Sequence, residues 1–178
     1  MRLPTLVFAA LAATSASVAL PQAGAQAYNI EVIVFRAGGS AADAGAATEP
    51  MVSGGDSGAG DGGVARFVGT LPAASLQLGG IAARLRSSGA YRPLAHAGWV
   101  QTASPWGSRS GFSVGRVGLG ADGLAGTTWL ERGQYLHLGF TLTLGRATIN
   151  EIRRVRLGEK NYFDNPEFGV IAVVTAAR

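Results

Sequence analysis

The stretch "GTTWLERGQYLHLGFTLTL", residues 126–144, decides the fold. In its second half, large apolar side chains alternate with others, a period of two that is typical of a β-strand with one buried face. The side chains expected to face inward are Leu136, Leu138, Phe140, Leu142 and Leu144, and those expected to face outward are Tyr135, His137, Thr141 and Thr143. Glu131-Arg132-Gly133 predicts the turn of a hairpin between two antiparallel strands.

Five more segments have the composition of strands. "YNIEVIVF", residues 28–35, is almost continuous in apolar and β-branched side chains, with Glu31 as its single charge, which favours a central strand covered on both faces. The other four cover residues 91–101, 110–119, 147–157 and 168–175. Neighbouring strands with short connections predict an antiparallel β-sheet meander.

One amphipathic helix is predicted over residues 72–88. Pro72 suits the start of a helix, and Gly89 suits its C-terminal cap. An apolar stripe recurs at helical spacing at Ala74, Leu78, Ile81 and Leu85. Gly79 and Gly80 each cost about 1 kcal/mol relative to Ala, so the helix depends on packing against a sheet. The fold class is therefore α+β, with one covering helix.

The N-terminal residues 1–27 have the features of a signal peptide. A basic start precedes an apolar run, and Ala25 and Ala27 provide the small residues at positions −3 and −1 that signal peptidase accepts. We expect export to the periplasm, cleavage after Ala27, and a single domain over residues 28–178. Residues 37–63 are dense in Gly, Ala, Ser and Asp, which predicts a disordered insertion.

The charge is distributed unevenly. Residues 64–178 carry thirteen basic and six acidic side chains, a net charge of +7, whereas residues 28–63 carry one basic and five acidic side chains, a net charge of −4. A basic fold on an exported protein suggests an anionic polymer or an acidic membrane face as partner, and not nucleic acid. A solvated basic surface without a dedicated partner is the alternative.

Catalytic and metal-binding signatures are weak. The chain has no cysteine and two histidines, His96 and His137, on separate predicted strands. That is too few for a zinc site or a nucleophilic triad, so we expect no catalytic residue, metal or cofactor. Asp164 with Glu167 or Glu131 offers a carboxylate pair for a peptidoglycan hydrolase, the runner-up. Asp164-Asn165-Pro166 is more simply a turn with a capped backbone amide.

Aromatic and arginine side chains offer a binding chemistry for glycans, because rings stack on sugar faces and guanidinium groups pair with carboxylates. The candidates are Trp99, Trp106, Trp129, Tyr135 and Tyr162 among the aromatics, and Arg153, Arg154 and Arg156 among the arginines. Alternation along the strand places Arg153 and Arg154 on opposite faces. We expect one of the two to pair with Glu31. Alternation also places Trp99 with Ala95 and Ala97, which favours the core.

The order of several blocks carries a family resemblance. "YNIEVIVF", the low-complexity gap, "YRPLAHAGWVQ", "YLHLGFTL" and "RRVRLGEKNYFDNPEFGVIAVV" resemble the CsiV family, periplasmic peptidoglycan-binding proteins of Gram-negative bacteria. The resemblance spans almost the whole chain after residue 27, apart from residues 37–63. It implies a non-enzymatic protein that binds peptidoglycan and supports cell-wall synthesis through a bifunctional penicillin-binding protein and its outer-membrane lipoprotein activator. A protein-only adaptor of a wall synthase complex is a third reading.

The resemblance also suggests residue roles. It implies ligand binding by Trp99, Gln101, Tyr135, His137, Arg153, Arg154, Tyr162 and Asp164. Structural roles are implied for Glu31, Tyr91, Pro93, Pro166 and Gly169. Leu94 and His96 match the family pattern as well. The chain departs from the family at Asn161 and Asn165, where the family usually has His, so any role of those His side chains is lost here.

Overall fold

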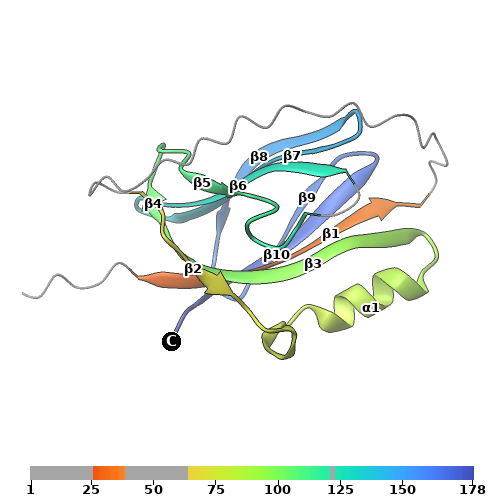
Figure 1. Cartoon of the computed structure of the whole chain (residues 1–178), viewed down its shortest axis with the longest axis horizontal. Helices are drawn as coiled ribbons and strands as arrows, with labels where there is room; N and C mark the ends of the chain where they lie inside the picture. The colour runs from red at the N-terminus through yellow and green to blue at the C-terminus, as the bar shows by residue number, and fades with distance from the viewer. Residues whose placement is uncertain (1–25, 39–63, 121–122) are drawn as a thin grey trace, which may run out of the picture.

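The computed structural model describes residues 26–38, 64–120 and 123–178, which form two β-sheets and one α-helix (Figure 1). The first sheet has the strand order β2-β3-β1-β10-β9, and the second has the order β4-β6-β7-β8 with β5 paired to β6. The strands of the first sheet are β1 (Ala27–Ala37), β2 (Phe67–Thr70), β3 (Tyr91–Thr102), β9 (Lys160–Asp164) and β10 (Phe168–Ala176). Those of the second are β4 (Ser104–Pro105), β5 (Gly111–Ser113), β6 (Leu124–Arg132), β7 (Leu136–Leu144) and β8 (Ala147–Val155).

The α+β class is confirmed, since one helix accompanies mostly antiparallel strands. The single meander is wrong. Strands consecutive in the chain are neighbours in β2–β3, in β5–β6–β7–β8 and in β9–β10, whereas β1 lies between β3 and β10 in the first sheet. The apolar pattern showed which segments are strands, but pairing between distant segments depends on tertiary packing, which periodicity does not reveal.

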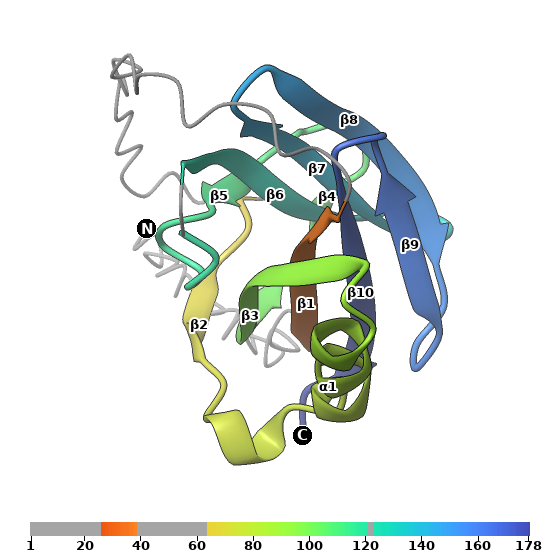
Figure 2. The same ribbon diagram turned by 90° about the vertical axis from the view of Figure 1, so that its right-hand side faces the viewer.

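Three layers result, with the helix α1 (Gly79–Ser87) on one side of the first sheet and the second sheet on the other (Figure 2). The main core lies between the sheets and includes Ile30, Trp99, Leu138 and Phe140, all fully buried. Hence β1 is covered on both faces, as its continuous apolar sequence predicts.

A smaller core lies under the helix, where Leu78, Ala82 and Leu85 pack with side chains of β1 and β10. The helix is shorter than the predicted 72–88. A 3₁₀ turn, Ala73–Ser75, precedes it, and Ala74 is exposed. The helix lacks the first turns that were predicted for it, because the backbone at Leu76 is extended, with φ −77° and ψ 131°. Gly89 ends the helix in the left-handed region, with φ +66°, as predicted.

The predicted hairpin of residues 126–144 is confirmed, with nine register pairs joining β6 and β7. Leu138, Phe140, Leu142 and Leu144 face the core. Its turn differs from the prediction, because Glu131 belongs to β6 and the bend comes later, at residues 133–135.

One other strand prediction needs correction, and one strand was not predicted. Of residues 110–119, only Gly111–Ser113 form a strand, because residues 114–118 turn back on themselves with Gly118 at φ +80°. Residues 160–164, to which no strand was assigned from the sequence, form the edge strand β9, so Asp164 of the predicted turn ends this strand. Asn165 makes the turn that follows, since its side-chain oxygen accepts the Glu167 N–H at 3.0 Å.

Some predictions fall outside the described residues. The apolar run of the predicted signal peptide and Ala25 lie in residues 1–25, and most of the predicted insertion lies in residues 39–63. Ala37 is the last residue of β1 and does not belong to a loop. Among the described residues, no helix is long and apolar enough to cross a membrane.

Candidate binding face on the second sheet

The outer face of the second sheet, turned away from the first, presents three rows of side chains across β6, β7 and β8. Strand register sets the rows, because paired residues on one face lie side by side. They are Glu131, His137 and Arg154 in row one, Trp129, Gly139 and Ile152 in row two, and Thr127, Thr141 and Asn150 in row three. Charged, aromatic and hydroxyl groups thus share one face, which we call the outer face.

Row one is extended by two exposed aromatic rings. The Arg154 guanidinium carbon lies 3.4 Å from the centroid of Tyr135, which is 41% exposed. Trp106, 52% exposed, packs its indole 4.0 Å from the ring centroid of His137. The face therefore places a cation and two aromatic surfaces within reach of a polymer, the combination that carbohydrate and carboxylate recognition uses.

Glu131 holds the loop that carries Trp106. Its carboxylate is fully buried and accepts the Gly107 N–H at 3.0 Å and the Arg109 N–H at 2.5 Å. Arg109 has φ +51°, a left-handed backbone that is uncommon outside glycine. Both carboxylate oxygens thus serve backbone amides, so Glu131 positions residues 106–109 and its oxygens are not open to a substrate.

Rows two and three form a groove of about 480 Å³. This is within the range of roughly 300–1,000 Å³ typical of small-ligand sites. Its lining consists of Arg109, Thr127, Trp129, Thr141, Asn150, Glu151 and Ile152. The guanidinium of Arg109 lies 5.5 Å from the Trp129 ring and 5.9 Å from the Trp106 ring, so it links the groove to row one.

Gly139 allows the Trp129 indole to lie across the middle of the sheet. A Cβ at position 139 would lie 2.3 Å from an indole carbon of Trp129. We expect Gly139→Ala to displace the indole and lower the free energy of unfolding by about 1–3 kcal/mol. Gly80→Ala is the matched control, because nothing lies within 4 Å of its added Cβ, and we expect it to gain up to about 1 kcal/mol. Urea unfolding of both variants tests the contrast, and equal stabilities would contradict it.

Two buried polar atoms on the outer face have no hydrogen-bond partner within the described part of the chain. They are the indole nitrogen of Trp129, a residue that is 6% exposed, and Nδ1 of His137. Buried polar groups are nearly always paired, so each of these needs an explanation. Both atoms are themselves buried, so they do not mark an open contact for a ligand.

Three of the eight predicted ligand-binding residues lie on or beside this face, namely Tyr135, His137 and Arg154. Trp99 and Gln101 do not lie on it, and their burial in the core opposes the predicted ligand contact. Both are fully buried, and the Trp99 indole N–H donates to the Gln101 side chain at 2.6 Å. The alternation that placed Trp99 with two alanines indicated this outcome, because that face of β3 packs into the core.

Arg153, Tyr162 and Asp164 are also separate from the outer face. Arg153 pairs with Glu151 at 2.5 Å and lies over the Phe163 ring. Tyr162 stacks on Phe35 in the first sheet, with ring centroids 6.1 Å apart. Burial raises the pKa of Tyr162, with Asp164 and then Tyr91 as further causes.

The aromatic cluster around Phe35 explains several predicted structural residues. Tyr91 meets Phe35 edge-on at 5.4 Å, and Pro93 pairs with Phe35 where the register of β1 and β3 shifts. Gly169 is required beneath the ring, because a Cβ there would lie 2.7 Å from a Phe35 carbon. Pro166 lies in the turn between β9 and β10.

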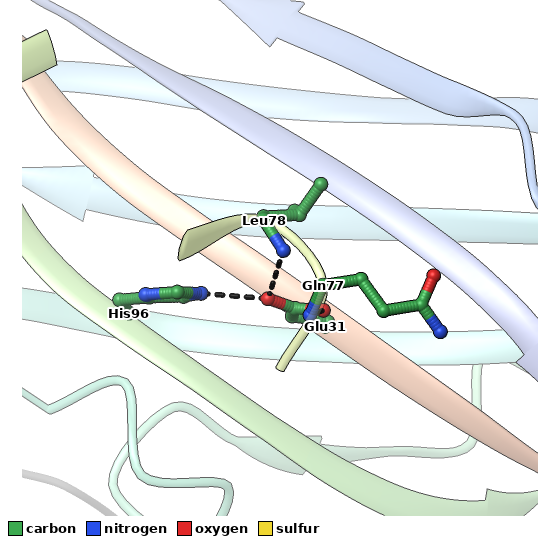
Figure 3. Close-up of polar contacts among 4 residues, drawn as sticks. All are labelled: Glu31, Gln77, Leu78 and His96. Atoms are coloured by element: carbon green, nitrogen blue, oxygen red, sulfur yellow. Dashed lines mark hydrogen bonds and ion pairs between the residues drawn. The ribbon is translucent and has the colours of Figure 1, made fainter. Parts of the chain in front are cut away.

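Glu31 contacts two backbone amides and a histidine, and not the predicted Arg153 or Arg154, which lie against Glu151 and Tyr135 (Figure 3). Its carboxylate accepts the backbone N–H groups of Gln77 and Leu78 at 2.6 and 2.8 Å, and Nε2 of His96 lies 2.7 Å away. A carboxylate at a helix N-terminus satisfies free amides and complements the helix dipole. The hollow beside Glu31, about 150 Å³, is smaller than typical ligand sites. Glu31 therefore attaches the helix to β1.

Arg109 is the residue of this face that sequence reasoning missed. It sits in a segment of small residues, and no strand periodicity predicts on which face its side chain lies.

Among the described residues, no group of three or more His, Cys, Asp or Glu side chains is placed to hold a metal ion. Comparison of the chain with protein-family models, curated proteins and solved structures found no match.

Proposed function

We propose that this protein is an exported, non-catalytic peptidoglycan-binding protein that supports cell-wall synthesis, acting with a bifunctional penicillin-binding protein and its outer-membrane lipoprotein activator. The observation that carries the binding proposal is the gathering of Trp106, Arg109, Tyr135 and Arg154 on one exposed face. The sequence resemblance supplies the wall polymer and the protein partners.

Charge supports an anionic polymer as ligand. Arg109 and Arg154 are both exposed and both lie over aromatic rings, which hold each guanidinium in place. Stem peptides of the wall carry free carboxylates, and guanidinium pairs with carboxylate through two parallel hydrogen bonds. Binding through these contacts is non-covalent, which agrees with a non-catalytic role.

The position of Glu131 weakens the hydrolase alternative. A general acid must reach the leaving group, but both oxygens of Glu131 accept backbone amides and the residue is fully buried. Asp164 lies at the end of β9 in the other sheet. The pair of Asp164 with Glu131 is thus not assembled at one exposed point.

Co-sedimentation of residues 28–178 with purified sacculi across a salt series tests the proposal. We expect the protein to pellet with sacculi at low salt and to be released progressively as salt rises, because exposed charge pairs are screened. Protein that stays in the supernatant at every salt concentration contradicts wall binding and leaves the adaptor reading. Release of soluble muropeptides, lost in Asp164→Asn, would instead support the hydrolase.

A further inference from the structure

We infer that the groove in rows two and three binds the glycan of the wall, a chain of N-acetylated sugars, and not its stem peptides. This inference rests on the proposed function and names the part of the polymer that this site takes. The argument starts from the charge of the groove. Its lining holds one cation, Arg109, and one acid, Glu151, whose carboxylate pairs with Arg153, while the other five lining side chains are neutral. Within the described residues, one unpaired cation among five neutral side chains suits a polar ligand with few charges.

The neutral side chains offer the hydrogen bonds that a sugar needs. The Thr141 hydroxyl donates to Oδ1 of Asn150 at 3.1 Å, which orients the amide and leaves its NH₂ group as a donor. Thr127 is exposed beside Thr141 in the same row. An acetamido carbonyl can accept from the Asn150 amide, and sugar hydroxyls can pair with the two threonines.

The apolar side chains offer a surface for a sugar ring. Trp129 and Ile152 flank Gly139, and the Trp129 indole lies over this glycine. The Trp129 indole N–H is itself buried, so Trp129 offers a sugar the exposed part of its ring. Trp106, half exposed beyond Arg109, extends the aromatic surface toward the next sugar along the chain.

The test uses chitotetraose, four β-1,4-linked N-acetylglucosamine units without peptide or carboxylate, and a free stem pentapeptide as the rival probe. Indole N–H resonances are followed in ¹⁵N-labelled protein, whose three tryptophans give three signals. We expect millimolar chitotetraose to shift the Trp129 signal and the peptide to leave it in place. Asn150→Ala should weaken binding about tenfold, the effect of losing one hydrogen bond of roughly 1.4 kcal/mol. Thr143→Val is the matched control, because Thr143 lies on β7 outside the groove lining.

The outcomes separate this inference from the proposed function. Sacculus binding without a chitotetraose shift, or a Trp129 shift caused by the peptide, overturns the glycan assignment and leaves wall binding intact. A chitotetraose shift that Asn150→Ala weakens and Thr143→Val does not supports the assignment. If neither sacculi nor chitotetraose bind, both proposals are wrong.

Discussion

Replacing Glu31 by Ala is expected to lower the free energy of unfolding by about 3–5 kcal/mol. The carboxylate accepts two backbone N–H groups at the start of the helix and lies against His96, and hydrogen bonds to a charged group contribute about 1.5–3 kcal/mol each. Their loss leaves the amides of Gln77 and Leu78 without acceptors and loosens the helix from the sheet. Urea unfolding followed by circular dichroism measures the change.

Two further variants separate the parts of this interaction. His96→Ala removes one partner and keeps both backbone hydrogen bonds, so we expect a smaller loss than in Glu31→Ala. Glu151→Ala is the control, because its partner Arg153 is 44% exposed and such pairs contribute about 0–1 kcal/mol. A Glu31→Ala protein within 1 kcal/mol of the wild type would show that the carboxylate does not hold the helix.

Replacing Trp99 by Ala is expected to cost about 3–5 kcal/mol, the range for removing a large aromatic side chain from a core. Trp99 is fully buried between the sheets, and its removal also leaves the Gln101 side chain without its indole donor. Thermal unfolding provides the measurement. A second substitution at position 99 tests whether Trp99 contacts a ligand.

Trp99→Phe keeps much of the buried volume and should retain sacculus binding at temperatures where the variant is folded. Trp106→Phe is its counterpart on the exposed face, where we expect little change in stability and weaker binding. The structural role of Trp99 would be contradicted if Trp99→Phe kept the wild-type melting temperature and lost binding.

Period-two alternation predicted the strands that carry the outer face, and it placed Arg153 and Arg154 on opposite sides correctly. It also showed that β1 is central, because an apolar run without alternation requires cover on both faces. Alternation assigns a face to each residue of a strand, but it does not show which strands pair or which face lies in the core.

The remaining features depend on contacts between distant segments. Glu131 receives its role from a loop more than twenty residues earlier, and Glu31 receives its partners from residues 77, 78 and 96. Arg109 lines the groove and has a left-handed backbone conformation, which the pattern of side chains in the sequence does not predict. The charge and burial of Glu31 predicted that its carboxylate has a partner. They did not identify the partner, because an arginine and two backbone amides satisfy a buried carboxylate equally well.

Arg153 and Arg154 give the most direct test of the claim that the outer face binds the wall. They are adjacent in β8 and both exposed, but Arg154 lies over Tyr135 on the outer face, whereas Arg153 pairs with Glu151 and lies over Phe163. Sacculus co-sedimentation at low salt should show strong loss of binding in Arg154→Ala and near wild-type binding in Arg153→Ala. Equal losses in the two variants, or a loss confined to Arg153→Ala, would contradict the assignment of the binding face.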